Sequence, residues 1–208
     1  MKFNKIVALA FAAVLGFGAQ TANAQSLSPS TKWHWDKGTI VVETPARPAG
    51  QKNVLGLKLP KYKTVRIGLV GLGMRGPGAV DNFCVLPGVE IVALCDFVEA
   101  RAVAQNEKLR KRGLPPAAIY SGENGYKELC ARPDIDLVYI ATDWAHHFPV
   151  AECALKNGKN VADEVPSAMN LEECWKLVDL SEKMQKNCMI LENCCYDWFE
   201  MRTLNMAQ

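Results

Sequence analysis

The chain has 208 residues, with 24 Lys and Arg against 22 Asp and Glu, so its formal net charge is only +2. This near-balance gives no support to nucleic-acid binding, which depends on a strongly basic surface, and we expect no nucleic-acid partner. The length suits one well-buried domain and is too short for two comfortable ones.

The first 24 residues have the pattern of a signal peptide. Lys2 and Lys5 supply a positive start, residues 6–18 form an apolar run, and Ala22-Asn23-Ala24 is an A-x-A cleavage site. The apolar run is shorter than the roughly 20 residues of a bilayer-spanning helix. We therefore expect export, cleavage after Ala24, and a periplasmic or secreted protein that is free of the membrane; a retained anchor is the alternative.

Residues 25–64 lack sustained periodicity and contain several prolines, which predicts an N-terminal arm or linker. Within it, "KWHWDKG" (residues 32–38) places two Trp around His34. We favour an aromatic arm that packs on the domain's own surface, with a sugar-stacking patch as the alternative.

From Val65 to Tyr196 short apolar runs alternate with helical periodicity. The expected strands are Val65–Val70, Glu90–Cys95, Ala118–Ser121, Leu137–Ala141, Asn160–Ala162 and Met189–Leu191. The expected helices are Pro77–Leu86, Val98–Arg112, Gly125–Ala131, His147–Asn157 and Leu171–Lys186, the last capped by Asn170 with Glu173. Nearly continuous apolar strands separated by helices predict an α/β fold, a Rossmann-type doubly wound parallel sheet of six strands.

The first of these strands runs into a glycine-rich loop. Gly71, Gly73 and Gly76 form G-x-G-x-x-G between a strand and a helix, the context in which the pattern indicates dinucleotide binding. Gly71 permits the tight turn, Gly73 lets pyrophosphate approach the backbone, and Gly76 lets helix and strand pack closely. Pro77 suits the first helical turn, whose free N–H groups would face the phosphates.

Asp96 ends the next strand, about 20 residues beyond the last glycine, where a ribose-binding carboxylate is expected. A carboxylate there accepts hydrogen bonds from the ribose 2′-hydroxyl and repels a 2′-phosphate, so the predicted cofactor is NAD rather than NADP. The alternative is that Asp96 is only a helix N-cap, directly before Phe97–Arg101.

All eight cysteines lie at Cys84 or later, and none has the spacing of a zinc site, so we expect no metal. Four of them fall in apolar or helically spaced contexts and are interpreted as small buried hydrophobic residues: Cys95, Cys153, Cys174 and Cys188. Redox chemistry at the adjacent pair Cys194-Cys195 is left open.

Four stretches carry a family resemblance: "VRIGLVGLGMRG", "VALCD", "IDLVYIATDWAHHFPVAECALKNGKNVADEVP" and "LENCCYDWFEMRTLNMA". In this order they resemble the superfamily of glucose-fructose oxidoreductase and inositol dehydrogenase. Within it the chain is most similar to glycoside hydrolase family 109, NAD-dependent glycosidases known for α-N-acetylgalactosaminidase activity. The resemblance covers residues 65–208, and the last two stretches are more specific than the glycine loop.

The resemblance implies a set of cofactor contacts at strand ends. They comprise Met74 and Arg75 in the phosphate loop, Asp96 on the adenosine ribose, Trp144, Ala145, His146 and His147 in the loop after the fourth strand, Glu164 and Val165 near the nicotinamide ribose, and Asn193 after the last strand. Without the resemblance, His146 and His147 would be interpreted as ordinary residues at the start of a helix.

Two positions depart from the wider superfamily. Its dehydrogenases usually carry Glu-Lys-Pro after the fifth strand, where Lys manages the proton of the reacting hydroxyl, whereas this chain has Glu164-Val165-Pro166. An aliphatic side chain cannot move a proton, and the resemblance assigns this form to the glycosidase branch. Asp143 stands where relatives usually have Pro and is expected to alter the loop under the nicotinamide.

The implied reaction oxidises the sugar at C3, removes the C2 proton with loss of the C1 substituent, adds water and returns the hydride. Such chemistry needs no pair of flanking carboxylates. The resemblance also implies a second α/β domain that carries the sugar contacts and the catalytic His. We expect that domain to be missing here and residues 197–208 to begin the helix that leads to it.

The chain by itself is therefore expected to be inactive, and its catalytic residues are unknown. Supporting roles are expected for Glu164 and Tyr196. For Tyr196, a place in the core as a buried aromatic residue is an equal alternative. The expected substrate is an α-N-acetylgalactosaminide-like glycoside, and a homo-oligomer is left open. The alternatives are a sugar dehydrogenase and a non-catalytic NAD-binding fragment.

Overall fold

A computed structural model describes residues 33–42 and 46–207 of the chain, so the expected signal peptide lies outside the described residues. The chain divides into two compact units, Met1–Ala46 and Arg47–Gln208. The described part of the first is an antiparallel hairpin of β1 (Trp33–Asp36) and β2 (Thr39–Val42). No strand was predicted here; Lys37 and Gly38, both with positive φ, form the kind of two-residue turn that joins such strands.

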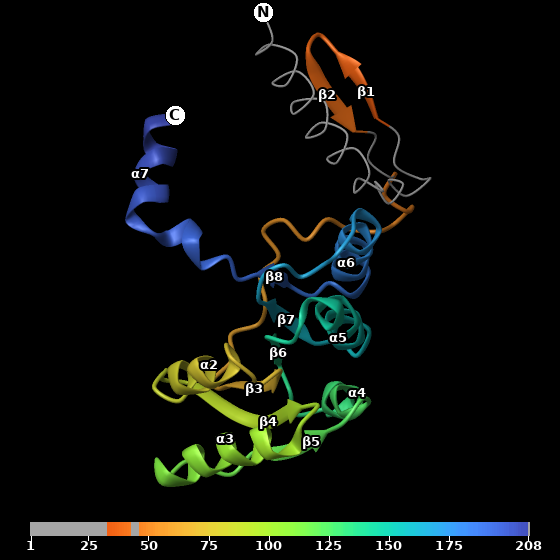
Figure 1. Cartoon of the computed structure of the whole chain (residues 1–208). Coiled ribbons are helices and arrows are strands. Elements are labelled where there is room, and N and C mark those ends of the chain that lie inside the picture. Colours follow the sequence, from red (N-terminus) through yellow and green to blue (C-terminus); the bar gives the residue numbers. More distant parts are fainter. Residues whose placement is uncertain (1–32, 43–45, 208) are drawn as a thin grey trace, which may run out of the picture. The chain divides into compact units, whose positions relative to one another are not determined.

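The second unit is built on a six-stranded sheet in the order β5-β4-β3-β6-β7-β8, and every pairing in it is parallel. The strands are β3 (Val65–Val70), β4 (Val89–Asp96), β5 (Ala118–Ser121), β6 (Leu137–Ile140), β7 (Asn160–Asp163) and β8 (Cys188–Ile190) (Figure 1). This confirms the predicted doubly wound sheet. The strand order reverses between β3 and β6, and such a switch point is where open α/β sheets bind ligands.

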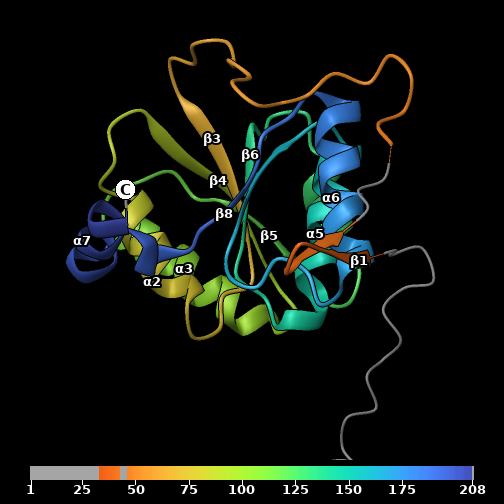
Figure 2. The same ribbon diagram turned by 90° about the horizontal axis from the view of Figure 1, so that it is seen from above.

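Helices cover both faces of this sheet, as Figure 2 shows. One face carries α2 (Gly76–Phe83) and α3 (Glu99–Lys111); the other carries α4 (Gly125–Ala131), α5 (Trp144–Lys156) and α6 (Leu171–Met184). The short η1 (Asn193–Tyr196) and α7 (Trp198–Ala207) follow β8.

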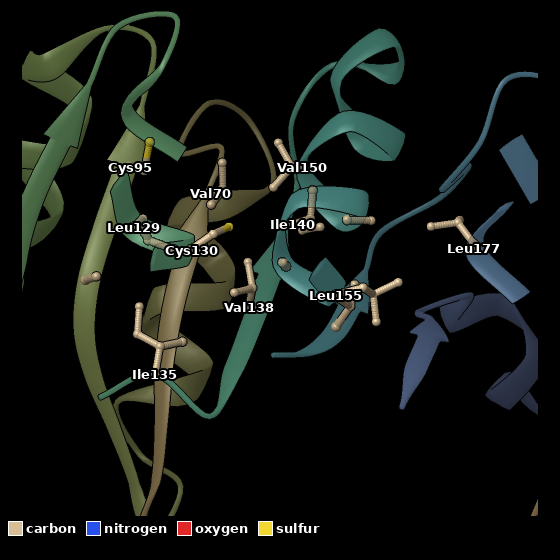
Figure 3. Packing of buried hydrophobic residues seen from close by; sticks show 14 residues of the cluster. Val70, Cys95, Leu129, Cys130, Ile135, Val138, Ile140, Val150, Leu155 and Leu177 are labelled. Atoms are coloured by element: carbon tan, nitrogen blue, oxygen red, sulfur yellow. The ribbon is translucent and has the colours of Figure 1, made fainter. Parts of the chain in front are cut away.

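Alternate residues of each strand fill two separate apolar cores. On β6, Val138 and Ile140 pack with α4 and α5, whereas Tyr139 packs with residues of α2 and α3 on the opposite face. Figure 3 shows the first of these cores, where Leu129 and Leu155 approach the strands from their helices. Both faces are buried, so the strands need apolar residues at nearly every position.

The start of α5 differs from the prediction. The helix begins at Trp144 and not at His147, because the Asp143 side chain caps it by accepting a hydrogen bond of 3.1 Å from the Ala145 N–H. Residues 144–146, expected in the loop before the helix, therefore form its first turn together with His147. The predicted cap of α6 is confirmed, since Asn170 Oδ1 accepts from the Glu173 N–H at 2.9 Å.

All eight cysteines lie in the described part and are free thiols. Cys95 is buried and Cys153 and Cys188 are half-buried, but Cys174 is exposed. The interpretation of Cys174 as buried is wrong, because the inward face of α6 is taken by Leu177 and Leu180.

Within residues 33–42 and 46–207 no cluster of His, Cys, Asp or Glu could hold a metal ion. No helix in the same residues is long and apolar enough to cross a membrane.

Candidate dinucleotide-binding site

A cleft of about 340 Å³ opens at the carboxyl ends of β3, β4 and β6. Residues from the loops that follow these strands line it, among them Gly71, Gly73, Asp96, Thr142 and His146. A larger hollow of about 840 Å³ lies between residues 48–52 and α6, but none of the predicted contacts lines it. The smaller cleft is the candidate site, because it lies at the switch point of the sheet.

The glycine loop leaves room for a ligand at only one of its three glycines. A Cβ on Gly71, whose φ is +91°, would lie 2.4 Å from the Ala141 carbonyl oxygen, and a Cβ on Gly76 would lie 2.1 Å from the Gly71 oxygen. A Cβ on Gly73 would meet only the Arg101 guanidinium, at 3.8 Å. Gly71 and Gly76 thus allow the close packing of β3, β6 and α2, while Gly73 exposes open backbone to which a pyrophosphate can bind.

Asp96 joins the glycine loop to the end of β4. Its carboxylate is buried and accepts hydrogen bonds from the Leu72 N–H at 2.7 Å and the Val98 N–H at 2.9 Å, and Arg101 Nη1 lies 3.4 Å away. The N-cap of α3 is Val98, so Asp96 does not occupy the capping position considered as an alternative. Two carboxylate oxygens offer about four acceptor sites, so Asp96 can keep these bonds and accept a ribose hydroxyl.

Beside the cleft, hydrogen bonds from one arginine link the glycine loop to the residues that follow β7 and β8; we call this set the Arg75 bridge. Arg75, in the glycine loop, places Nε 3.3 Å from Glu164 Oε1 and Nη2 3.1 Å from Asn193 Oδ1. Three residues that are far apart in the chain, all predicted as cofactor contacts, are therefore brought together. Tyr139, which was not predicted, donates from its hydroxyl to the same Glu164 oxygen at 3.0 Å.

Tyr139 fixes Glu164 from within the core. Its ring is 3 % exposed and packs edge-on against Phe83 at 5.4 Å, and burial followed by the Glu164 hydrogen bond raises the pKa of its hydroxyl. The signal for it was present in "LVYI", where one phenol interrupts an aliphatic strand, because a buried Tyr hydroxyl needs a partner.

Replacing Tyr139 by Phe keeps the contact with Phe83 but removes the hydrogen bond to Glu164. We expect unfolding in urea to show a loss of about 1.5 kcal/mol, the low end for a bond to a charged group. NAD affinity, measured by calorimetry, should also fall, because Glu164 then has only exposed Arg75 to hold it. Wild-type stability and affinity together would contradict this role.

The two adjacent histidines have different environments. His146 is exposed, lines the cleft, and places Nδ1 2.7 Å from Asp143 Oδ2. His147 is 1 % exposed and places Nδ1 2.5 Å from Oδ1 of Asp163, which is fully buried. Burial alone would lower the pKa of His147, but the bond to Asp163 raises it overall; burial raises the pKa of Asp163 against the pull of His147.

The predicted contacts thus fall into three groups. Those that line the cleft are Gly71, Gly73, Met74, Asp96 and His146. Those in the bridge beside it are Arg75, Glu164 and Asn193. The others lie off the cleft lining: Trp144 and Ala145 are exposed on the first turn of α5, Val165 is exposed after β7, and Gly76 and His147 are buried.

A glycine loop at a switch point, backed by a buried carboxylate, defines a dinucleotide-binding α/β domain. The chain belongs to the oxidoreductase family with an NAD-binding Rossmann fold, whose model matches residues 65–192. This match confirms NAD as the cofactor predicted for the domain.

The chain is similar to two curated proteins of Phocaeicola vulgatus. It is 68% identical to glycosyl hydrolase family 109 protein 5 over 189 residues, which cover 91% of this chain and 36% of that protein. It is 61% identical to glycosyl hydrolase family 109 protein 4 over 210 residues, which cover 100% of this chain and 41% of that one. The chain therefore spans about two fifths of the length of these relatives.

Among solved structures, the chain is similar to myo-inositol dehydrogenase from Lactobacillus casei in complex with NAD(H) and myo-inositol. The identity is 28% and the TM-score 0.59, over 69% of this chain and 41% of that one. The likeness is to an enzyme crystallised with both a nicotinamide cofactor and a polyol.

Proposed function

We propose that this chain is the NAD-binding part of a glycosidase that hydrolyses α-N-acetylgalactosaminides through transient oxidation of the sugar at C3. The observation that carries the proposal is Val165. It is 42% exposed directly after Glu164, where dehydrogenases of the superfamily usually carry a proton-handling Lys. The high identity to proteins named glycosyl hydrolase family 109 supports the same conclusion.

The residues of this chain would bind and orient the cofactor, which when bound supplies a hydride acceptor for C3 of the sugar and returns the hydride at the end. The open backbone at Gly73 and the N-terminus of α2 would hold the pyrophosphate. Asp96 would accept a hydrogen bond from the adenosine ribose. Glu164, directly after β7, and Asn193, at the start of η1 after β8, are held by Arg75 and would orient the nicotinamide side.

The test uses a polypeptide that extends this chain to the length of its curated relatives. It is expected to cleave an aryl α-N-acetylgalactosaminide without added NAD and without accumulating NADH. In heavy water the product should carry deuterium at C2, because the proton lost beside the transient ketone is replaced from solvent. Direct displacement at C1 leaves C2 unlabelled, and a plain sugar dehydrogenase forms NADH with the glycosidic bond intact; either result overturns the proposal.

We also propose export of the mature protein to the periplasm or the medium, on the strength of the signal-peptide pattern in residues 1–24. N-terminal sequencing of the mature protein should then begin at Gln25. A protein that retains Met1 would contradict export with cleavage.

A further inference from the structure

The buried pair of His147 and Asp163 joins two parts of the chain that carry cofactor contacts. His147 lies in the first turn of α5, and Asp163 is the last residue of β7, next to Glu164. Neither residue lines the cleft. Oδ2 of Asp163 and Oγ of Ser167 are also buried, and within the described residues neither has a hydrogen-bond partner.

Stability alone does not explain this pair. A buried ion pair usually contributes no more than well-packed apolar residues of similar volume. Val161, two residues earlier on the same face of β7, belongs to the apolar core, so the sheet accommodates an aliphatic side chain on that face. A hydrogen bond differs from apolar packing in being directional, which suits it to fix the position of one element against another.

The two elements that the pair joins, α5 and β7, each lie next to residues of the candidate site. On the α5 side, Thr142, Asp143 and His146 line the cleft. On the β7 side, Glu164 receives hydrogen bonds from Tyr139 and Arg75. A shift between the first turn of α5 and the end of β7 would therefore change the spacing between the cleft lining and the Arg75 bridge.

We propose that His147 and Asp163 are positioning residues for the NAD site, and that His147 acts through Asp163 rather than by touching the cofactor. The pair holds residues 142–146 at the distance from Glu164 that the dinucleotide requires. The inference depends on NAD binding and is independent of the glycosidase reaction. It is therefore tested by NAD affinity and hydrogen exchange and not by glycoside cleavage.

The experiment measures NAD affinity by calorimetry for the purified chain and its variants. Asp163→Leu removes the hydrogen bond but fills the buried space, and we expect it to weaken NAD about tenfold, within the range for residues that couple to a site. Asp163→Asn keeps an acceptor for the His147 Nδ1–H and should restore affinity to within about threefold of wild type. His147→Asn, which retains a side-chain donor near Nδ1, should likewise bind better than His147→Leu.

Asp136→Asn is the matched control, because Asp136 pairs with Arg66 at the opposite, amino end of the sheet, with Nη2 2.9 Å from Oδ1. It should lower thermal stability without changing NAD affinity. Hydrogen exchange of the amides of residues 142–146 should speed up in Asp163→Leu and stay unchanged in Asp136→Asn.

Wild-type NAD affinity in a folded Asp163→Leu variant overturns the inference. Equal losses of affinity in Asp163→Leu and Asp136→Asn also overturn it, because the effect would then follow stability and not position.

Discussion

Replacing Gly71 by Ala is expected to abolish measurable NAD binding and to lower the free energy of unfolding by about 3 kcal/mol or more. The backbone at Gly71 has φ +91°, a conformation that L side chains rarely adopt, and the added methyl would lie 2.4–2.6 Å from backbone atoms of Ala141 and Thr142. Backbone cannot rotate out of the way as a side chain can. The ends of β3 and β6 would have to separate, and the cleft lies at those ends.

Alanine substitutions at two other glycines serve as controls for Gly71→Ala. They distinguish a loss of NAD binding caused by backbone strain from one caused by a methyl group in the space of the ligand. Gly73→Ala meets only the Arg101 side chain, so it should fold normally but bind NAD weakly, because its methyl occupies the space open to the pyrophosphate. Gly78→Ala meets no atom within 4 Å in α2, and should bind NAD normally and gain about 0.5–1 kcal/mol of stability. Urea unfolding and calorimetry measure both quantities. A Gly71→Ala chain with wild-type stability and affinity would show that the loop tolerates a side chain.

The sheet could be predicted from the sequence because its strands are short apolar runs bounded by turns. β3 and β5 lie where predicted, and no end of the other strands differs from the prediction by more than one residue. The start of α5 was missed because Asp143 caps it, and a single Asp before Trp is a weak signal compared with the apolar periodicity that begins at His147. The hairpin at residues 33–42 was missed because prolines on both sides of it indicated an irregular arm.

The position of the site could also be predicted from the sequence, since parallel strands bring their carboxyl ends to one edge. The side-chain contacts that stabilise the site could not be predicted. Asp163 is placed beside His147 by the register of β7 on β6, in which Asp163 pairs with Ile140, and by the burial of the first turn of α5. Neither the register nor the choice among several carboxylates as the partner of His147 is encoded in the local pattern.

Asp96 provides the second large effect, and it concerns the choice of nucleotide. Asp96→Ala is expected to weaken NAD by about 1.5–3 kcal/mol, the cost of losing hydrogen bonds to a charged acceptor, which is roughly a 10- to 150-fold change in Kd. Part of this loss would arise from the glycine loop, because the Leu72 N–H loses its acceptor. Asp96→Asn removes the charge and keeps one carbonyl acceptor, while its NH2 group replaces the second oxygen, so either the Leu72 or the Val98 N–H loses its acceptor. It should still retain more NAD affinity than Asp96→Ala.

The charge of Asp96 also determines how the site treats NADP. The carboxylate repels a 2′-phosphate, and it holds Arg101 Nη1 at 3.4 Å, where the guanidinium is partly neutralised. In Asp96→Asn the repulsion disappears and Arg101, whose side chain is 54% exposed, becomes free to pair with the phosphate. Calorimetry with both nucleotides should therefore show the preference for NAD shrinking or reversing in Asp96→Asn, and returning in part when Arg101→Ala is added. An unchanged ratio of the two affinities in every variant would mean that Asp96 serves only to hold the glycine loop against β4.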